Sequence, residues 1–184
     1  MFILYAIPIG IAAGFLLGGR LERLGDLRFR WGGLALAGLL VQVLLFSGPV
    51  ASAIGAAGPA VYVASTAAVL LAVLRNVRIP GLPLVTAGAA ANLAAIAANG
   101  GVMPAEPEAV AGLGPGAEGF SNSVVMADPA LRTLTDIFAL PAWLPFANVF
   151  SLGDVLIGLG VVVVIALGMR GGAGTPVLGG TSPD

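Results

Sequence analysis

Asp136 and Asp154 are the residues of this chain best suited to acid–base chemistry, and Arg132 is the cation closest to them in sequence. Two carboxylates that meet could hold a hard cation such as Mg²⁺, and an arginine could stabilise developing negative charge. However, the chain has no histidine and no cysteine, which removes the commonest general base, the commonest metal ligand and all thiol chemistry. Since a hydrolase needs a nucleophile beside a base, we predict no catalytic, metal-binding or cofactor-binding residue. An enzyme that uses Asp136 and Asp154 stays an alternative.

Amide side chains are the second group that could contact a ligand. Asn92 and Asn99 share one face of an otherwise apolar stretch. Amides face lipid only at a cost, so we expect both to point inward and to pair with Gln42, Ser65 or Thr66. The main interpretation is hydrogen bonding between helices. The alternative is a contact with a solute, in a transporter or channel component for a small neutral or lipidic molecule.

Glycines in the first apolar stretch recur with the spacing of a helix-packing face. Gly10, Gly14 and Gly18 stand four residues apart, and small residues at this spacing let a second helix backbone approach closely. The pattern predicts helix packing. The partner can be another helix of the chain, a second copy or a different membrane protein.

Two short motifs mark helix ends. In Asn99-Gly100-Gly101-Val102-Met103-Pro104, glycine just after an apolar stretch fits a left-handed cap and the proline prevents continuation of the helix. In Ser151-Leu152-Gly153-Asp154, the serine and the aspartate have the spacing of a capping box. Capping therefore explains Asp154 without a catalytic role.

The elements that carry these residues are long apolar stretches. Mean hydropathy is +1.03 and 9% of the 184 residues are charged, against roughly 25% in soluble domains. Crossing the hydrocarbon of a bilayer takes about 20 apolar residues. We therefore predict an all-α integral membrane protein, a bundle of about five transmembrane helices that span 2–19, 31–48, 58–74, 82–99 and 153–169.

The arginines predict an orientation. Of the eight basic residues, seven lie in short gaps on one side of these stretches, namely Arg20, Arg23, Arg28, Arg30, Arg75, Arg78 and Arg170. Basic residues in short loops mark the cytoplasmic side. We expect a multi-pass protein of the inner (cytoplasmic) membrane with its N-terminus outside and its C-terminus in the cytoplasm. The arginines are spread along a rim instead of clustered on one face, so no nucleic-acid partner is predicted.

The remaining sequence divides into an outer loop and a tail. Residues 100–150 form the loop, which we expect to be irregular at first and then to hold a short interfacial helix. Leu131, Leu134 and Phe138 recur at helical spacing, and Arg132 stands four residues from Asp128 and from Asp136, as in salt bridges on a helix. Residues 1–170 are predicted to be one transmembrane domain and residues 171–184 a disordered cytoplasmic tail.

The two helix-end motifs, together with Gly18-Gly19-Arg20-Leu21 after the first stretch and Phe150 and Val155 around the capping box, resemble domain-of-unknown-function family 5317. The resemblance covers about residues 1–170. It implies a small bacterial integral membrane protein, and it brings no established activity, cofactor or catalytic residue.

The function that we expect from the sequence is a non-enzymatic accessory or scaffold subunit of a membrane assembly. Its partners would be the lipid bilayer and a membrane protein or second copy at the Gly10/Gly14/Gly18 face. The transporter component and the outer-face enzyme remain the alternatives.

Overall fold

The computed structural model describes residues 2–113 and 123–171, and this part of the chain is mostly helical. Its α-helices are α1 (Ala6–Leu16), α2 (Gly32–Leu45), α3 (Gly48–Ile54), α4 (Gly58–Leu74), α5 (Leu82–Ala98), α6 (Pro107–Ala111) and α7 (Leu152–Gly168). Short 3-10 turns are η1 (Phe2–Tyr5), η2 (Leu21–Asp26), η3 (Gly55–Ala57) and η4 (Arg132–Leu134). The strands are β1 (Met103–Ala105), β2 (Ser123–Val125), β3 (Phe138–Ala139) and β4 (Val149–Phe150).

The prediction of a helical protein is confirmed, and five helices lie where the apolar stretches predicted them. One helical run among the described residues, Ser52–Leu74, is long and apolar enough to cross a membrane by length and composition. The other four apolar helices have 10–17 residues each. These are Phe2–Leu16, Gly32–Leu45, Leu82–Ala98 and Leu152–Gly168.

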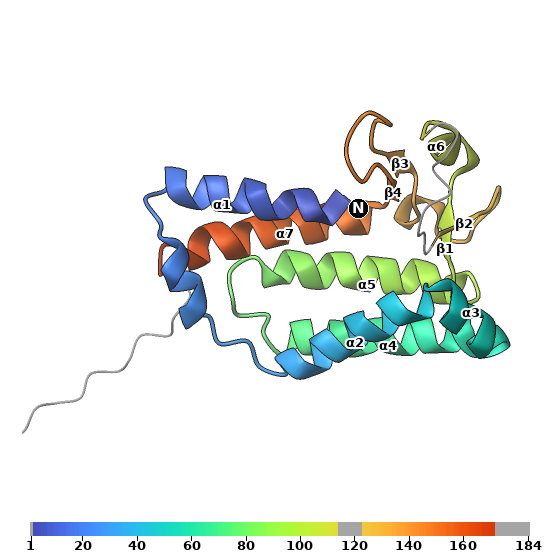
Figure 1. The fold of residues 1–184 in the computed structure, drawn as a ribbon, viewed down its shortest axis with the longest axis horizontal. Coiled ribbons are helices and arrows are strands. Elements are labelled where there is room, and N and C mark those ends of the chain that lie inside the picture. Colours follow the sequence, from blue (N-terminus) through green and yellow to red (C-terminus); the bar gives the residue numbers. More distant parts are fainter. Residues whose placement is uncertain (1, 114–122, 172–184) are drawn as a thin grey trace, which may run out of the picture.

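The five long helices lie along the long axis of the molecule (Figure 1); α1 and α7 run in the same direction, and the other neighbouring helices run antiparallel. Their packing gives the order α1, α7, α5, α4, α2, in which each helix contacts the next. Helix α2 lies at one edge and packs mainly on α4, which leaves Leu36, Leu40 and Val43 more than half exposed. The layout is therefore a row of helices with α7 and α5 at its centre.

Glycines allow α7 to lie close to both of its neighbours. A Cβ added at Gly10 of α1 would lie 3.0 Å from the Cβ of Ile165, and one added at Gly14 would overlap Met169. Gly18 ends the α1 segment at φ +74° with no neighbouring atom within 4 Å of an added Cβ. The predicted packing face thus contacts α7 of the same chain at Gly10 and Gly14. Association of this face with another chain stays a prediction.

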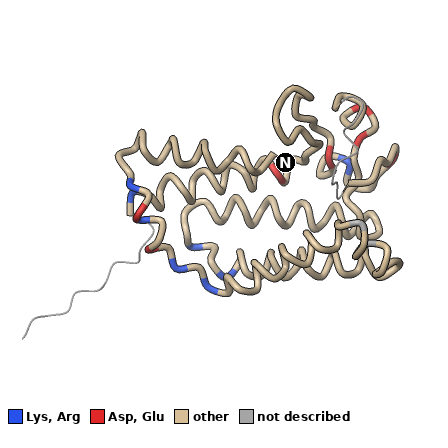
Figure 2. The backbone as a smooth tube through the Cα atoms, in the orientation of Figure 1, with Lys and Arg blue, Asp and Glu red and all other residues tan. Residues whose placement is uncertain are grey.

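The two ends of the helix row differ in charge (Figure 2). The turns after α1, α4 and α7 carry the seven arginines predicted to share one side, and we call this the basic end. The described residues of 100–150 gather at the opposite end, which we call the cap end, and the segment itself the cap.

The cap differs from the sequence prediction in two respects. The predicted interfacial helix around Leu131 to Phe138 is wrong: a 3-10 turn, η4, is the sole helical element there. Pro129 disfavours a helical conformation in the residue before it, and Leu131 has a left-handed φ of +53°. The first part of the cap was expected to be irregular, yet it contains β1 and α6.

Backbone hydrogen bonds to β1 explain why the chain around Asp136 is extended and not helical. The N–H of Asp136 donates to the carbonyl of Pro104 at 2.9 Å, and the N–H of Glu106 donates to the carbonyl of Asp136 at 3.0 Å. These bonds draw the chain alongside β1, which also pairs with β2 in parallel. Apart from Gly171, the predicted tail lies outside the described residues, as do 114–122 of the cap.

Candidate functional site at the cap end

The first turn of α7 is built as the capping box that the sequence predicts. The N–H of Asp154 donates to Ser151 Oγ at 3.0 Å, and the N–H of Ser151 donates to Asp154 Oδ2 at 3.2 Å. Ser151 is completely buried. Each side chain thereby satisfies a backbone donor that a helix start would otherwise leave unpaired.

Asn92 of α5 ties both capping side chains to the neighbouring helix. Its Nδ2 donates to Asp154 Oδ1 at 2.8 Å, and its Oδ1 accepts from Ser151 Oγ at 2.8 Å. The expectation that Asn92 points inward and bonds another helix is confirmed, but the expected partners are wrong. Gln42 instead donates to Thr66 Oγ1 at 3.2 Å, because α2 pairs with α4 and lies away from α5 in the helix row.

This triad of Asn92, Ser151 and Asp154 forms because α5 and α7 approach backbone to backbone. A Cβ added at Gly153 would overlap the Asn92 amide, and one added at Gly88 would overlap the Gly153 carbonyl. Glycine at both positions therefore creates the space in which the amide reaches the helix start. The triad is a dense packing contact with its hydrogen bonds made internally.

Asp136 is a buried carboxyl group at the cap end, whereas Asp154 is half-buried. Asp136 is 3% exposed, and its Oδ2 accepts a hydrogen bond from Ser123 Oγ. Burial raises the pKa of Asp136 to about 7; the hydrogen bond from Ser123 opposes this rise, and the negative charge of Asp154 adds to it. Asp136 thus fastens β2 to the rest of the cap and titrates near neutral pH.

The surroundings of Asp136 and Asp154 bear on the alternative of a metal-dependent enzyme. No cluster of three or more carboxylate, histidine or cysteine residues occurs in the part of the chain that the structure describes. Two surface grooves, of about 540 and 340 Å³, lie along α4, and neither is lined by Asp136 or Asp154. In the structure, Asp136 connects β2 to the cap through Ser123, and Asp154 connects α7 to α5 through Asn92.

The motif that ends α5 connects the cap to two helices. The side-chain amide of Asn99 exchanges hydrogen bonds of 2.9 and 2.8 Å with the backbone of Ala130. Gly101 has a left-handed φ of +85°, and an added Cβ would lie 2.8 Å from the Pro59 carbonyl oxygen. The predicted helix stop is confirmed, and the motif also positions the cap against α4.

The rest of that motif forms the floor of the cap. Gly100 has φ +72°, as a left-handed helix cap requires, and no atom lies within 4 Å of an added Cβ. Met103 is 2% exposed and Pro104 is fully buried, both in β1. These residues therefore have structural roles.

Sequence reasoning missed two contacts in the cap. Ser123 was not singled out, and Arg132 donates from Nε and Nη2 to the two carboxylate oxygens of Glu106 instead of pairing with Asp128 or Asp136. This pair lowers the pKa of Glu106 and raises that of Arg132. The parallel pairing of β1 with β2 brings Ser123 to its position, and no local sequence pattern signals so short a strand pair.

The comparisons agree with the resemblance seen in the sequence. The model of a family of unknown function, DUF5317, matches residues 26–166. The match includes the Asn99–Pro104 and Phe150–Val155 motifs and leaves out the Gly18–Leu21 motif. No curated protein and no solved structure matches the chain.

Proposed function

We propose that this chain, which belongs to the DUF5317 family of unknown function, is a five-span membrane protein that serves as a non-enzymatic accessory or scaffold subunit. In this proposal α1, α2, α4, α5 and α7 cross the inner membrane. The N-terminus and the cap lie outside, and the basic end faces the cytoplasm.

Exposed apolar side chains support the membrane location. Leu36 is 69% exposed, Leu16 88% and Ile9 56%, and each lies on a helix of the row. On α2, Leu36, Leu40 and Val43 share one exposed apolar face at helical spacing, and monomeric soluble proteins rarely expose large apolar patches. The α-helices of the proposed spans have 11–17 residues and reach about 16–26 Å at 1.5 Å per residue, and local thinning of the bilayer accommodates a short span.

The observation that carries the scaffold proposal is that the amide side chains within the helix row are hydrogen-bonded inside the protein, although the hydroxyl of Thr86 in α5 is buried without a hydrogen-bond partner. Asn92 bonds Asp154 and Ser151, and Gln42 bonds Thr66. Chemistry or transport needs polar groups that a ligand can reach. By contrast, no helix of the described chain covers the outward apolar face of α2. This exposed face suits contact with another membrane protein.

The alternatives have weaker support. A transporter component would use the amides Asn92, Asn99 and Gln42, but all three are hydrogen-bonded within the protein. An outer-face enzyme would use Asp136, whose pKa near 7 suits proton transfer. A residue that is 3% exposed would have to be uncovered before a substrate could reach it.

The test is purification of the tagged protein from its native membrane in mild detergent or nanodiscs, followed by mass spectrometry of intact complexes. A scaffold subunit is expected to carry a stoichiometric protein partner. Isolation as a lone monomer with a bound solute would contradict the proposal and favour the transporter alternative.

A matched pair of variants locates the contact. Leu36→Trp with Leu40→Trp adds bulk to the exposed edge of α2, which lipid tolerates and a packed partner does not. The control is Ile9→Trp, at an exposed position of α1. Loss of the partner with the α2 variant alone assigns the contact to α2.

A further inference from the structure

A buried amide at the basic end joins two arginine-bearing loops. Asn76, just after α4, is 5% exposed. Its Nδ2 donates to the carbonyls of Arg30 and Ala72 at 2.6 and 2.7 Å, and its Oδ1 accepts from the Arg30 N–H at 2.7 Å. Both backbone polar groups of Arg30 are therefore held by one side chain, 46 residues away in sequence.

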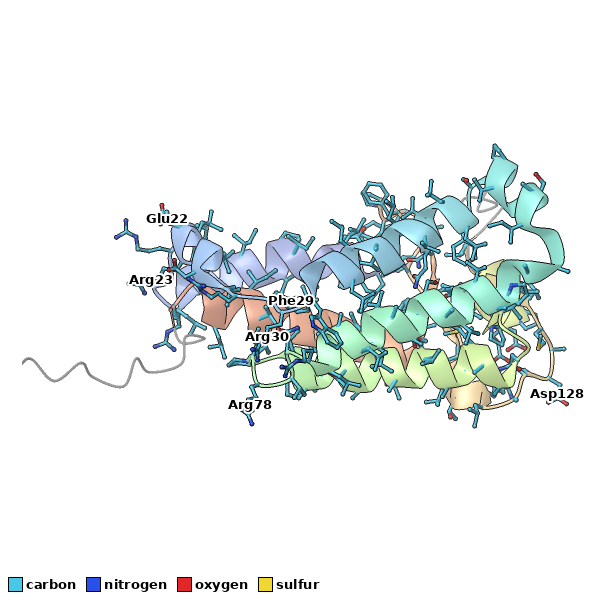
Figure 3. All side chains as sticks on the ribbon, turned by 90° about the horizontal axis from the view of Figure 1, so that it is seen from below. Glu22, Arg23, Phe29, Arg30, Arg78 and Asp128 are labelled. Atoms are coloured by element: carbon cyan, nitrogen blue, oxygen red, sulfur yellow. The ribbon has the colours of Figure 1, made fainter. Side chains whose placement is uncertain are left out.

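These hydrogen bonds, which we call the Asn76 clamp, hold together two loops that carry four arginines. Arg28 and Arg30 lie on the loop that precedes α2, and Arg75 and Arg78 flank Asn76. All four are exposed, and Figure 3 shows the labelled Arg30 and Arg78 at the same end of the molecule.

The four guanidinium groups are not neutralised within the described chain. Arg20 pairs with Glu22 at 3.4 Å, and Arg23 donates to the Arg170 carbonyl at 2.8 Å. The guanidinium groups of the four clustered arginines make no ion pair and no hydrogen bond with the described residues. Asp26 is the acidic residue closest to them in sequence. The surface keeps a net positive charge that a partner can use.

Exposed apolar and aromatic side chains alternate with these arginines. Phe29 is 39% exposed, Trp31 56% and Val77 38%. Trp31 begins α2 with a left-handed φ of +59°, which is uncommon for a residue other than glycine. The Asn76 clamp on the preceding residue fixes the chain direction that this conformation requires.

We propose that these two loops form a site for the phosphate of an anionic phospholipid in the inner leaflet. We call it the Arg28/Arg30/Arg75/Arg78 site, with Phe29 and Trp31 at its rim. Guanidinium groups bind phosphate oxygens in a bidentate manner, and aromatic rings beside them sit at the depth of headgroups. A nucleic acid or an acidic protein would satisfy the cations but would leave the apolar rim against water.

The site rests on the proposed membrane location, and the chain offers a reporter for both. It contains two tryptophans, Trp31 and Trp143, so Trp143→Phe leaves one emitter at the site. The protein is reconstituted in vesicles that contain about one-tenth lipid brominated near the headgroup end of its chains. The brominated lipid is either anionic phosphatidylglycerol or zwitterionic phosphatidylcholine.

The site predicts that brominated phosphatidylglycerol quenches Trp31 several-fold more than brominated phosphatidylcholine does at low salt. The difference should shrink in 0.5 M salt because the contact is electrostatic. Arg30→Gln with Arg78→Gln should reduce it at least threefold. Arg20→Gln with Arg170→Gln removes the same charge from the same end, and should leave it in place.

Asn76→Ala tests the contribution of the Asn76 hydrogen bonds separately from that of the arginine charges. It should reduce the lipid preference while all four arginines remain. Because this variant can also misfold, the exposed Arg30/Arg78 pair provides the decisive result.

The outcomes separate the two proposals. Equal quenching by the two brominated lipids would overturn the phospholipid site and leave the membrane location standing. No quenching by either lipid would overturn both. A preference that persists in Arg30→Gln/Arg78→Gln would show that the lipid binds elsewhere.

Discussion

The cap end and the basic end are both organised by a buried asparagine, but they use their charges in opposite ways. At the cap end, Asn92 bonds a capping serine and the half-buried Asp154, and Asp136 is buried. At the basic end, Asn76 bonds only backbone, and the arginines beside it stay exposed. The comparison indicates that ionisable groups at the cap end maintain the fold, whereas those at the basic end are free to meet a partner.

The largest expected effect concerns Asp136. Its pKa of about 7 lies above the ordinary value of 3.8, so the folded cap holds a proton that the unfolded cap releases between these values. Stability is therefore full below pH 4 and falls as pH rises to about 7, by on the order of 4 kcal/mol. Hydrogen exchange of β1 and the Asp136 region, corrected for the intrinsic rate, should show weaker protection at pH 8 than at pH 5.

The matched variant is Asp136→Asn, which keeps a hydrogen-bonding partner for Ser123 and cannot ionise. Protection in this variant should be independent of pH over the same range. A cap that is equally protected at pH 5 and pH 8 in the wild-type protein would refute the assignment of a structural, neutral carboxyl group to Asp136.

The second effect tests the close approach of α5 and α7. Gly153→Ala places a methyl group on the Asn92 amide, and overpacking of this kind costs typically about 1–3 kcal/mol. We expect a lower unfolding temperature in detergent. Gly33→Ala in α2 is the control, because no atom lies within 4 Å of its added Cβ. If both variants unfold at the same temperature, the contact is looser than the structure shows.

Removal of the Asn92 side chain should have an effect of similar size. Asn92→Ala leaves Asp154 with its backbone partner but without the amide donor, and loss of a hydrogen bond to a charged group costs roughly 1.5–3 kcal/mol. Gln42→Ala, which removes one bond to Thr66, should cost about 1 kcal/mol. Chemical unfolding in mixed micelles measures both. An equal cost for the two amides would remove the distinction between the triad and an ordinary interhelical bond.

The smallest effect is expected at the Glu106–Arg132 pair. The side chain of Arg132 is 62% exposed and that of Glu106 14%, and an ion pair with an exposed partner is screened by solvent and salt. Glu106→Gln should leave the unfolding temperature of the purified protein nearly unchanged, with any difference abolished in 0.5 M salt. A large, salt-resistant loss would mean that the cap end depends on exposed charge as well as on buried polar groups.

Helix positions and helix ends could be predicted from the sequence because their signals are local. Long apolar stretches, the Gly100-Gly101 stop and the Ser151/Asp154 capping box each lie within a few residues of the feature that they specify. The inward direction of Asn92 was also predictable from its place in an apolar helix. Its partners were not, since they depend on the order of helices in the row.

The missed contacts share one physical cause. Ser123 meets Asp136, and Asn76 meets Arg30, across separations that only tertiary packing closes. One sequence-level signal existed for the α5–α7 contact. Gly81 and Gly88 stand seven residues apart, as do Gly153 and Gly160, and each pair brings its helix against the other. Equal spacing on two helices indicates a close contact over two turns, and the structure shows that its direction is antiparallel.

The proposed topology places the cap end and the basic end on opposite sides of the inner membrane. Because the chain has no cysteine, single cysteines at Trp143 in the cap and at Glu22 in η2 can report this directly; both residues are exposed. An impermeant maleimide added to intact cells with a permeable outer envelope should label Trp143→Cys, and should label Glu22→Cys only after lysis. Labelling of both positions in intact cells, or of Glu22→Cys alone, would contradict the account.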